Sequence, residues 1–355
     1  MRFSLPLSTL SAGNELEGVL PNELGLLIGL EHLSTFSNNL VGPLPDNMQY
    51  LTYLKFLSIE SNLFTGPVPD WIKAFTSLEY MALGDNLFEG PLPSFADLQS
   101  LKEVTLDSNL LTGSVDVFND AVAIESLFLQ YNNFDSVIDS DLFFNLDNLR
   151  LLDMSSNNLG GSLPAHFYNV VILDLHNNSI SGEMPDIGID AASPMTFLSL
   201  FNNDMSGAIP ESLSFLSGLT HLDLSYNAFT GDLPAALNDL DQLTYLFLGD
   251  NEFDAGPFPN IWNLVNLQEL SLKNSRRVGP IPTWVGDILR ELILLDLHTN
   301  GFDSALPDSL GSLTNLAFLL LNRNELTGNI PDSFVGLDNL GTLQTPWMDS
   351  WLYDL

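Results

Sequence analysis

The sequence predicts an α/β solenoid in which about 14 repeats of about 24 residues stack around one parallel β-sheet. The first observation is a recurring asparagine. The second is the pattern of apolar residues around it, LxxLxLxxNxLxGxxP. The recurring position is occupied by Asn14, Asn38, Asn62, Asn86, Asn109, Asn132, Asn157, Asn178, Asn203, Asn227, Asn251, Ser275, Asn300 and Asn324. Such a period favours one continuous stack over separate globular units.

Each part of the pattern has a physical reason. The LxL portion predicts a short strand whose leucines point inward, while the residues between them point outward. The asparagine carries both a donor and an acceptor, so in the turn after the strand it can bind backbone groups that no sheet reaches. The glycine allows a tight bend, and the proline fixes φ on the return path.

The repeats resemble the plant-type leucine-rich repeat over about residues 10–345. The segments that carry the resemblance include Leu30–Pro45 (LEHLSTFSNNLVGPLP) and Leu316–Pro331 (LAFLLLNRNELTGNIP). The chain is similar in this respect to receptor-like kinase ectodomains and polygalacturonase-inhibiting proteins. The resemblance implies a right-handed superhelix with a concave parallel sheet and an extra short strand from the LxGxIP portion. It also implies recognition of peptides, proteins or glycans on the concave or flanking surface.

Three features depart from plant ectodomains. The chain has no cysteine for paired caps, one glycosylation sequon at Asn177, and neither a kinase nor a membrane segment. The resemblance suggests an extracellular or cell-surface location, yet we find no signal peptide in this chain. Whether the chain is a complete protein or a fragment, and whether a segment outside it provides a tether, stays open.

We expect residues 1–355 to form a single domain, with regular repeats over about residues 6–340. Repeat 1 is irregular, because Thr9 and Ser11 fill apolar positions. Residues 341–355 form an irregular tail, which is either an improvised cap or a truncation. The inward leucines Leu222, Leu224 and Leu246 should be buried.

Charge limits the classes of partner. The net charge is −35, from 45 acidic and 10 basic residues. Such a chain is a poor match for nucleic acid or an anionic membrane surface, so we expect neither as a partner. With no cysteine, the redox environment cannot be inferred.

Large rings gather at outward strand positions in repeats 9 to 11. The frame does not need aromatic residues there, which favours a ligand-binding surface, although aromatic residues also simply suit strands. The candidate residues are Phe197, Phe201, His221, Tyr226, Tyr245 and Phe247, with Phe128 added from repeat 6.

Repeat 12 breaks the pattern in LKNSRRVGPIP, residues 272–282. Ser275 replaces the asparagine, and Arg277 falls on an inward apolar position. Because burying an unpaired guanidinium is costly, we expect the backbone to depart near residues 275–278 and Arg277 to turn away from the core. Lys273, Arg276 and Arg323 are candidates for holding an anionic ligand group, unless they only pair with surface carboxylates.

Aspartate and histidine also occupy outward positions, at Asp153, Asp174, His176, His221, Asp223, Asp296 and His298. A hard-cation site is conceivable, but exposed aspartate in LDL strands has little cost in water, so we predict no metal and no cofactor. No nucleophile is accompanied by a base and an orienting group, so we expect no enzyme.

The predicted function is therefore non-enzymatic recognition of a protein, peptide or glycan, in signalling or at the cell surface. Two alternatives stay open: an inhibitor of a cell-wall-degrading hydrolase, and a structural or surface-adsorbing repeat protein.

Overall fold

The computed structural model describes residues 7–10, 13–188 and 193–345. They form two compact units: unit 1 comprises the described part of residues 1–166 and 172–179, and unit 2 that of residues 167–171 and 180–355. Each unit is described by itself, and the single domain over residues 1–355 stays a prediction. The last ten residues of the tail lie outside the described residues, so neither idea about the tail is tested.

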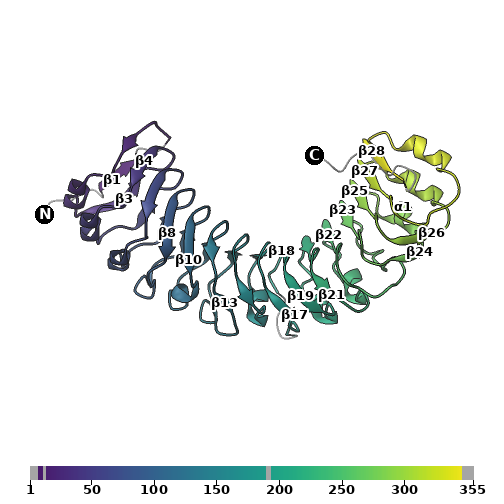
Figure 1. Ribbon diagram of the computed structural model, residues 1–355, viewed down its shortest axis with the longest axis horizontal. Coiled ribbons are helices and arrows are strands. Elements are labelled where there is room, and N and C mark those ends of the chain that lie inside the picture. Colours follow the sequence, from purple (N-terminus) through teal and green to yellow (C-terminus); the bar gives the residue numbers. More distant parts are fainter. Residues whose placement is uncertain (1–6, 11–12, 189–192, 346–355) are drawn as a thin grey trace. The chain divides into compact units, whose positions relative to one another are not determined.

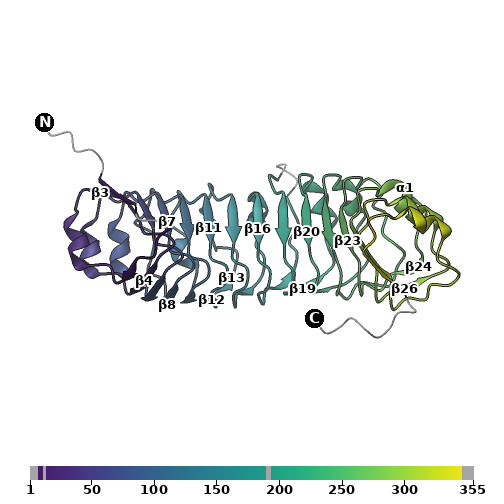
Figure 2. The ribbon, with the colours of Figure 1, turned by 90° about the horizontal axis from the view of Figure 1, so that it is seen from above.

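Parallel strands form a long sheet in each unit, and their order in space follows their order in the chain (Figures 1 and 2). In unit 1 they are β1 (Leu7–Leu10), β3 (Leu30–Ser34), β5 (Phe56–Ser58), β7 (Tyr80–Ala82), β9 (Glu103–Thr105), β11 (Ser126–Phe128), β14 (Leu151–Asp153) and β16 (Ile172–Asp174). In unit 2 they are β18 (Phe197–Ser199), β20 (His221–Asp223), β22 (Tyr245–Phe247), β23 (Glu269–Ser271), β25 (Leu294–Asp296), β27 (Phe318–Leu320) and β28 (Thr342–Gln344). Parallel pairing of these strands confirms the predicted fold class.

Shorter sheets come from the LxGxIP portions, as the resemblance implied. In unit 1 they contain β2 (Glu17–Gly18), β4 (Asn39–Gly42), β6 (Leu63–Gly66), β8 (Leu87–Pro91), β10 (Leu110–Gly113), β12 (Asn133–Phe134), β13 (Val137–Ile138) and β15 (Gly160–Gly161). In unit 2 they contain β17 (Ser181–Glu183), β19 (Asp204–Gly207), β21 (Ala228–Phe229), β24 (Val278–Pro280) and β26 (Gly301–Asp303).

Single helical turns return the chain behind the sheets. The α-helix is α1 (Trp284–Ile288), and the 3-10 helices are η1 (Asn22–Leu26), η2 (Asp46–Tyr50), η3 (Asp70–Ala74), η4 (Asp116–Phe118), η5 (Ala165–Asn169), η6 (Glu211–Phe215), η7 (Ala235–Asp239), η8 (Asp308–Ser312) and η9 (Asp332–Gly336). A proline with φ near −72° precedes several of them, for example Pro45 before η2. Its fixed φ starts the turn where the backbone N–H would have no helical partner.

The core consists of the inward residues of these repeats. Leu222, Leu224 and Leu246 are 0% exposed, as predicted. At the N-terminus the pairing of β1 with β3 shifts register between Leu7 and Ser8, which confirms that the first strand is irregular.

The recurring asparagines bind the backbone at four points, and Asn62 shows the arrangement. Its Oδ1 accepts the N–H of Leu40, at 3.0 Å. Its Nδ2 donates to the carbonyl oxygens of Thr35, Ile59 and Glu60, at 2.9–3.1 Å. The side chain is 6% exposed, so these carbonyl groups could not bind water instead. The sequence-based role of the asparagine is confirmed.

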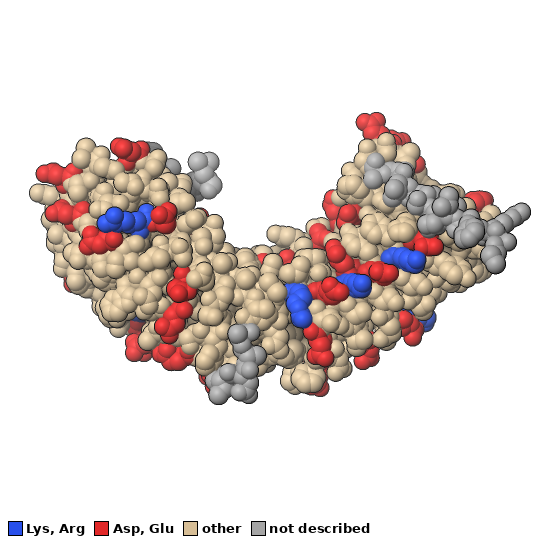
Figure 3. Space-filling view, turned by 180° about the vertical axis from the view of Figure 1, so that it is seen from behind, with Lys and Arg blue, Asp and Glu red and all other residues tan. Residues whose placement is uncertain are grey.

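A line of alternating charges runs across unit 1 (Figure 3). Successive backbone hydrogen bonds join neighbouring strands at this position, seven residues before each asparagine, so the side chains are adjacent. Lys55 binds Glu31 at 2.7 Å, and Lys102 lies 3.6 Å from Glu79. Alternation avoids the repulsion that like charges would have on strands about 4.8 Å apart. The line comprises Glu31, Lys55, Glu79, Lys102, Glu125 and Arg150.

For repeat 12, the predicted departure of the backbone is confirmed, whereas the predicted outward turn of Arg277 is contradicted. The backbone departs as expected, because Arg276 has φ of 56° after Asn274 has already taken the usual positive φ. The predicted outward turn of Arg277 is wrong, because its side chain is only 2% exposed.

Backbone carbonyl groups explain why Arg277 stays inside. Its Nε donates to the carbonyl oxygen of Ser275 at 2.8 Å, and its Nη2 donates to that of Asp254. Gly256 provides the room, since a Cβ there would lie 3.0 Å from Nη1. Burial lowers the pKa of Arg277, while Asp232 and Asp254 oppose that shift. The guanidinium is therefore hydrogen-bonded, and the premise that it would be unpaired does not hold.

Candidate ligand-binding surface

An aromatic surface covers the exposed face of the long sheet in unit 2. Strands β18, β20 and β22 carry it; Figure 1 labels β18 and β22, and Figure 2 labels β20. The inward residue of each strand is buried and its outward neighbour half-buried, because successive side chains of a strand point to opposite faces. The aromatic surface comprises Phe197, Phe201, His221, Tyr226, Tyr245 and Phe247.

His221 lies at the centre of the ring contacts. Its ring stacks on Phe197, with centroids 4.3 Å apart and an interplanar angle of 15°. The centroids of Tyr245 and Phe247 lie 5.4 and 5.9 Å from that of His221. Pairing of His221 with both Phe197 and Tyr245 in the sheet register explains the contacts. The sequence-based grouping of these four residues is thus reproduced in space.

Lys273 closes one side of the aromatic surface. Its Nζ lies 4.4 Å from the ring centroid of Tyr226 and donates to the Tyr226 hydroxyl at 2.6 Å. The ring of Tyr226 meets Phe201 edge to face at 5.3 Å. Nζ also lies 2.9 Å from Asp250. Lys273 therefore holds Tyr226 in place, and part of its charge is already neutralised.

Burial would lower the pKa of Lys273, but the hydrogen bonds to Tyr226 and Asp250 and the attraction of Asp250 together raise it above its usual value. The ammonium therefore keeps its charge at neutral pH. Its main effect on the surface is to orient Tyr226, which remains 44% exposed.

The other predicted basic residues are placed differently. Arg276 is exposed, and its Nη1 donates to the carbonyl oxygens of Glu252 and Phe253 at 3.2 and 3.4 Å. Arg323 is exposed after β27, with φ of 56°. A shared anion site at Lys273, Arg276 and Arg323 stays a prediction.

Phe128 lies in unit 1, at the end of β11. It is half-buried and pairs in register with Thr105 and Asp153. Its inclusion in a site with the residues of repeats 9–11 stays a prediction.

Two of the outward aspartates each bind a histidine two residues further along the same repeat. Asp174 accepts a hydrogen bond from the N–H of His176 and lies 2.7 Å from its Nδ1. Asp296 and His298 repeat this arrangement at 2.6 Å. Within the described parts of the chain, no group of three or more His, Cys, Asp or Glu residues could hold a metal ion.

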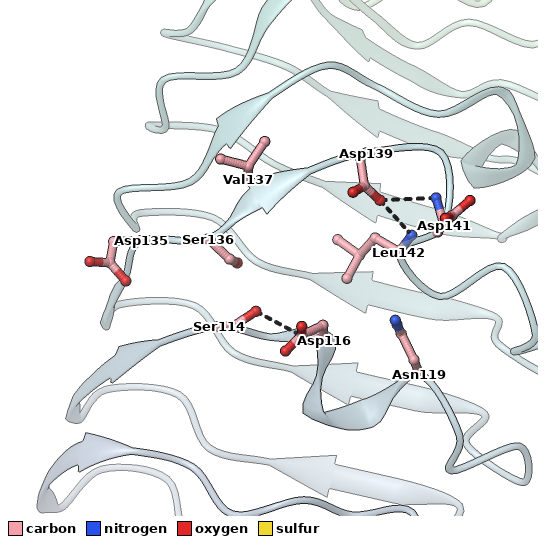
Figure 4. A pocket seen from close by; sticks show the side chains of 9 residues that line it. All are labelled: Ser114, Asp116, Asn119, Asp135, Ser136, Val137, Asp139, Asp141 and Leu142. Carbon is pink, nitrogen blue, oxygen red and sulfur yellow. Dashed lines mark hydrogen bonds between the residues drawn. The ribbon is translucent and has the colours of Figure 1, made fainter.

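A cavity of about 360 Å³ opens beside η4 in unit 1 (Figure 4). Acidic side chains line it, but at least some of them cap turns. Asp139 Oδ1 accepts the N–H groups of Asp141 and Leu142, at 2.9 and 3.2 Å. We assign no ligand to this cavity.

Sequence analysis missed a second group of rings, which lies in unit 1. Phe56 and Tyr80 stack with centroids 4.5 Å apart and an interplanar angle of 5°. The ring of His32 follows at 6.2 Å from Phe56. All three occupy the position six residues before an asparagine, as Phe197, His221 and Tyr245 do. The same rule, applied to repeats 2 to 4, would have found them.

Comparison with known families agrees with this architecture. Two models, both described as leucine-rich repeat, match: one over residues 193–253 and the other over residues 148–170, 169–188 and 315–337. The chain is a leucine-rich repeat protein, with a long parallel sheet and many repeats.

Its repeats are similar to those of plant receptor proteins. Receptor-like protein 31 of Arabidopsis thaliana is 36% identical over 254 residues, which cover 64% of this chain and 29% of that protein. A chain in the crystal structure of the Arabidopsis receptor kinase HAESA, in complex with the peptide hormone IDA and the co-receptor SERK1, is 31% identical. It superposes with a TM-score of 0.84, over 95% of this chain and 61% of that chain.

The ectodomain of the Arabidopsis thaliana receptor kinase GASSHO1/SCHENGEN3, in complex with CASPARIAN STRIP INTEGRITY FACTOR 2, is also 31% identical, with a TM-score of 0.78. The match covers 95% of this chain and 47% of that one. The chain thus spans less than a third of Receptor-like protein 31, and about half to three fifths of the two solved chains. Within the described residues, no helix has the length and apolar character needed to cross a membrane.

Proposed function

We propose that the chain is a non-enzymatic recognition module that binds its ligand on the aromatic surface of unit 2. The observation that carries the proposal is the continuous set of ring contacts centred on His221, on a sheet face that the repeat pattern leaves free of any structural need for aromatic residues. Exposed aromatic side chains offer large contact areas at a low cost in conformational entropy, which is why they dominate binding hot spots.

An extended peptide is the ligand class that we favour. The relatives with known structure include receptors solved with peptide ligands, and HAESA is one of them. Outward residues of parallel strands repeat about every 4.8 Å, so a ligand crossing β18, β20 and β22 meets a ring on each strand. Proteins and glycans with an extended exposed segment would meet the same rings. We further propose that such binding serves signalling or recognition at a cell surface.

The fixed position of Lys273 determines how strongly ligand binding should depend on salt concentration. Since Asp250 already balances its charge, Lys273 should contribute mainly by orienting Tyr226. Binding to the aromatic surface should therefore depend on apolar contact more than on ionic strength.

A ligand screen tests the proposal. Random peptide and glycan libraries are selected on the wild-type chain and on the variant Phe197→Ser/Tyr245→Ser/Phe247→Ser. These side chains point away from the core, so the variant should fold, which circular dichroism checks. The matched control is Phe318→Ser, which removes a 47% exposed ring from the same outward position on β27.

We expect enrichment on the wild type and on the control, and none on the triple variant. Enrichment that survives in the triple variant, or is absent from all three proteins, contradicts the proposal.

A further inference from the structure

We propose that the exposed sheet face of unit 1 holds a second, separate site, which binds an arginine- or lysine-bearing peptide segment between a wall of stacked rings and a wall of carboxylates. The site is formed by repeats 3 to 5 and is distinct from the aromatic surface of unit 2. Its rings are Phe56 and Tyr80, and its carboxylates are those of Glu60, Glu103 and Asp107.

Small residues form the floor between the two walls. Ser58 and Ala82, at the outward position between the rings and the carboxylates, are 4% and 0% exposed. Rings stand on one side of this floor, six residues before the asparagine. The carboxylates of Glu60 and Asp107 stand on the other side, two residues before it, whereas Glu103 lies six residues before Asn109 and continues the row of rings. The register of β5, β7 and β9 places Phe56, Tyr80 and Glu103 side by side, and Gly84 separates Glu60 from Asp107 in the other row.

The absence of a side chain at Gly84 leaves space for the carboxylate of Asp107 in the site. A Cβ at residue 84 would lie 2.4 Å from Oδ1 of Asp107, so the Asp107 side chain occupies the space that any other residue would fill. This position brings Asp107 close enough to Glu60 for the two charges to repel. Burial first, and then Asp107 and Glu103, raise the pKa of Glu60. Burial, Glu60 and Glu103 likewise raise the pKa of Tyr80.

The carboxylates have no cationic partner of their own. Across the residues that the structure describes, Glu60, Glu103 and Asp107 form no ion pair within 4 Å. The two nearest lysines in the sequence, Lys55 and Lys102, lie next to Glu31 and Glu79 in the alternating line instead.

A ligand cation complements this arrangement in two ways. A guanidinium or ammonium group attracts the carboxylates, and its face or alkyl stem packs on an aromatic ring. The cation would also relieve the repulsion between Glu60 and Asp107, which the free chain must tolerate. A neutral ligand would gain from the rings alone, so charge complementarity selects a basic segment.

The test uses a blocked pentapeptide of alternating glycine and arginine, and the same peptide with neutral citrulline in place of arginine. Affinity is measured by isothermal titration calorimetry on the wild type and on Glu60→Gln/Asp107→Asn. The control Asp303→Asn/Glu325→Gln removes the same charge from exposed positions in unit 2, so it reports the effect of the net charge of −35 alone.

We expect the wild type to prefer arginine over citrulline. We expect the Glu60/Asp107 variant to lose at least about fivefold in affinity, and the control pair to lose less than about twofold. Equal losses in both double variants would show general electrostatic attraction and overturn the proposal. Absence of binding to the wild type would overturn it as well.

Two further arms test the ring wall. Tyr80→Leu keeps an apolar side chain but removes the ring, and should weaken binding of the arginine peptide about threefold or more. Tyr50→Leu, at a 57% exposed tyrosine in η2, should leave it unchanged. If Tyr80→Leu has no effect, or if cellohexaose binds the wild type and the arginine peptide does not, the site is not the one proposed.

Discussion

Arg277 shows how one residue can break the repeat pattern without breaking the fold. Its guanidinium takes an inward apolar position and donates to the carbonyl oxygens of Ser275 and Asp254. Ser275 meanwhile donates its hydroxyl to the carbonyl oxygen of Leu272, at 2.5 Å. The bond from Ser275 corresponds to one that the asparagine makes in other repeats, whereas Arg277 binds two other carbonyl groups.

Replacing Arg277 should therefore destabilise the chain. Arg277→Ala removes donors from buried carbonyl groups and leaves space beside Gly256, so we expect a loss of about 1–3 kcal/mol in the free energy of unfolding. Urea denaturation measures it. The exposed Arg290 provides the control, since Arg290→Ala should change stability by less than about 0.5 kcal/mol. Equal stability of Arg277→Ala and wild type would show that the buried hydrogen bonds contribute nothing.

Sequence reasoning located this departure but not its direction. The missing asparagine at Ser275 and the charge at Arg277 were visible in the pattern. One acceptor that keeps Arg277 inside, the carbonyl oxygen of Asp254, belongs to the preceding repeat, and so does Gly256, which provides the space. Neither can be read from the local pattern, because backbone carbonyl groups carry no sequence signal of their own.

At the scale of the repeat, the asparagine is the element that joins neighbouring turns. Asn62 binds Leu40 and Thr35 of the preceding repeat and two carbonyl groups of its own. Because both side-chain functions are used, no other residue type can replace all four bonds.

Asn62→Ala should cost about 2–4 kcal/mol, since several buried backbone groups lose their partner at once. The matched control is Asn39→Ala, an exposed asparagine at the start of β4, which should change stability by less than about 0.5 kcal/mol. Thermal and urea denaturation of both variants give the comparison. A small effect of Asn62→Ala would mean that water replaces the lost hydrogen bonds.

The repeat scale is also where the sequence was most informative. The strands and the burial of Leu222 and Leu246 follow from the spacing, because each repeat packs on its neighbours in the same way, and the short second strands were implied by the family resemblance. Ring contacts in unit 2 followed from the same spacing. The hydrogen bond from Lys273 to Tyr226 could not be predicted from the spacing. It joins two residues 47 positions apart, through side-chain conformations that the repeat pattern does not determine.

For the whole molecule, the strong acidity has a measurable consequence. The pKa values of Glu60, Asp107 and Asp153 are all raised, with burial as the largest cause in each. A carboxyl group with a raised pKa in the folded chain lowers stability at every pH above that value, and the loss disappears on protonation.

We therefore expect the free energy of unfolding to increase as the pH falls through the raised pKa values of these groups towards their ordinary values, 4.5 for Glu60 and 3.8 for the two aspartates. The variant Glu60→Gln/Asp107→Asn should show a smaller increase, because two of the responsible groups no longer titrate. Urea denaturation across this range measures the slope. The expectation is contradicted if the wild type gains no more stability over this range than the double variant does.

The central claim is that the rings on β18, β20 and β22 form the recognition surface of the chain. The most direct measurement is the dissociation constant of one selected ligand for wild type, Tyr245→Ser and Phe318→Ser, by isothermal titration calorimetry. Tyr245→Ser should weaken binding about tenfold or more, as expected at the centre of an interface, and Phe318→Ser less than about twofold. Equal affinity for Tyr245→Ser and wild type, or a larger loss in Phe318→Ser, would place the ligand elsewhere and contradict the claim.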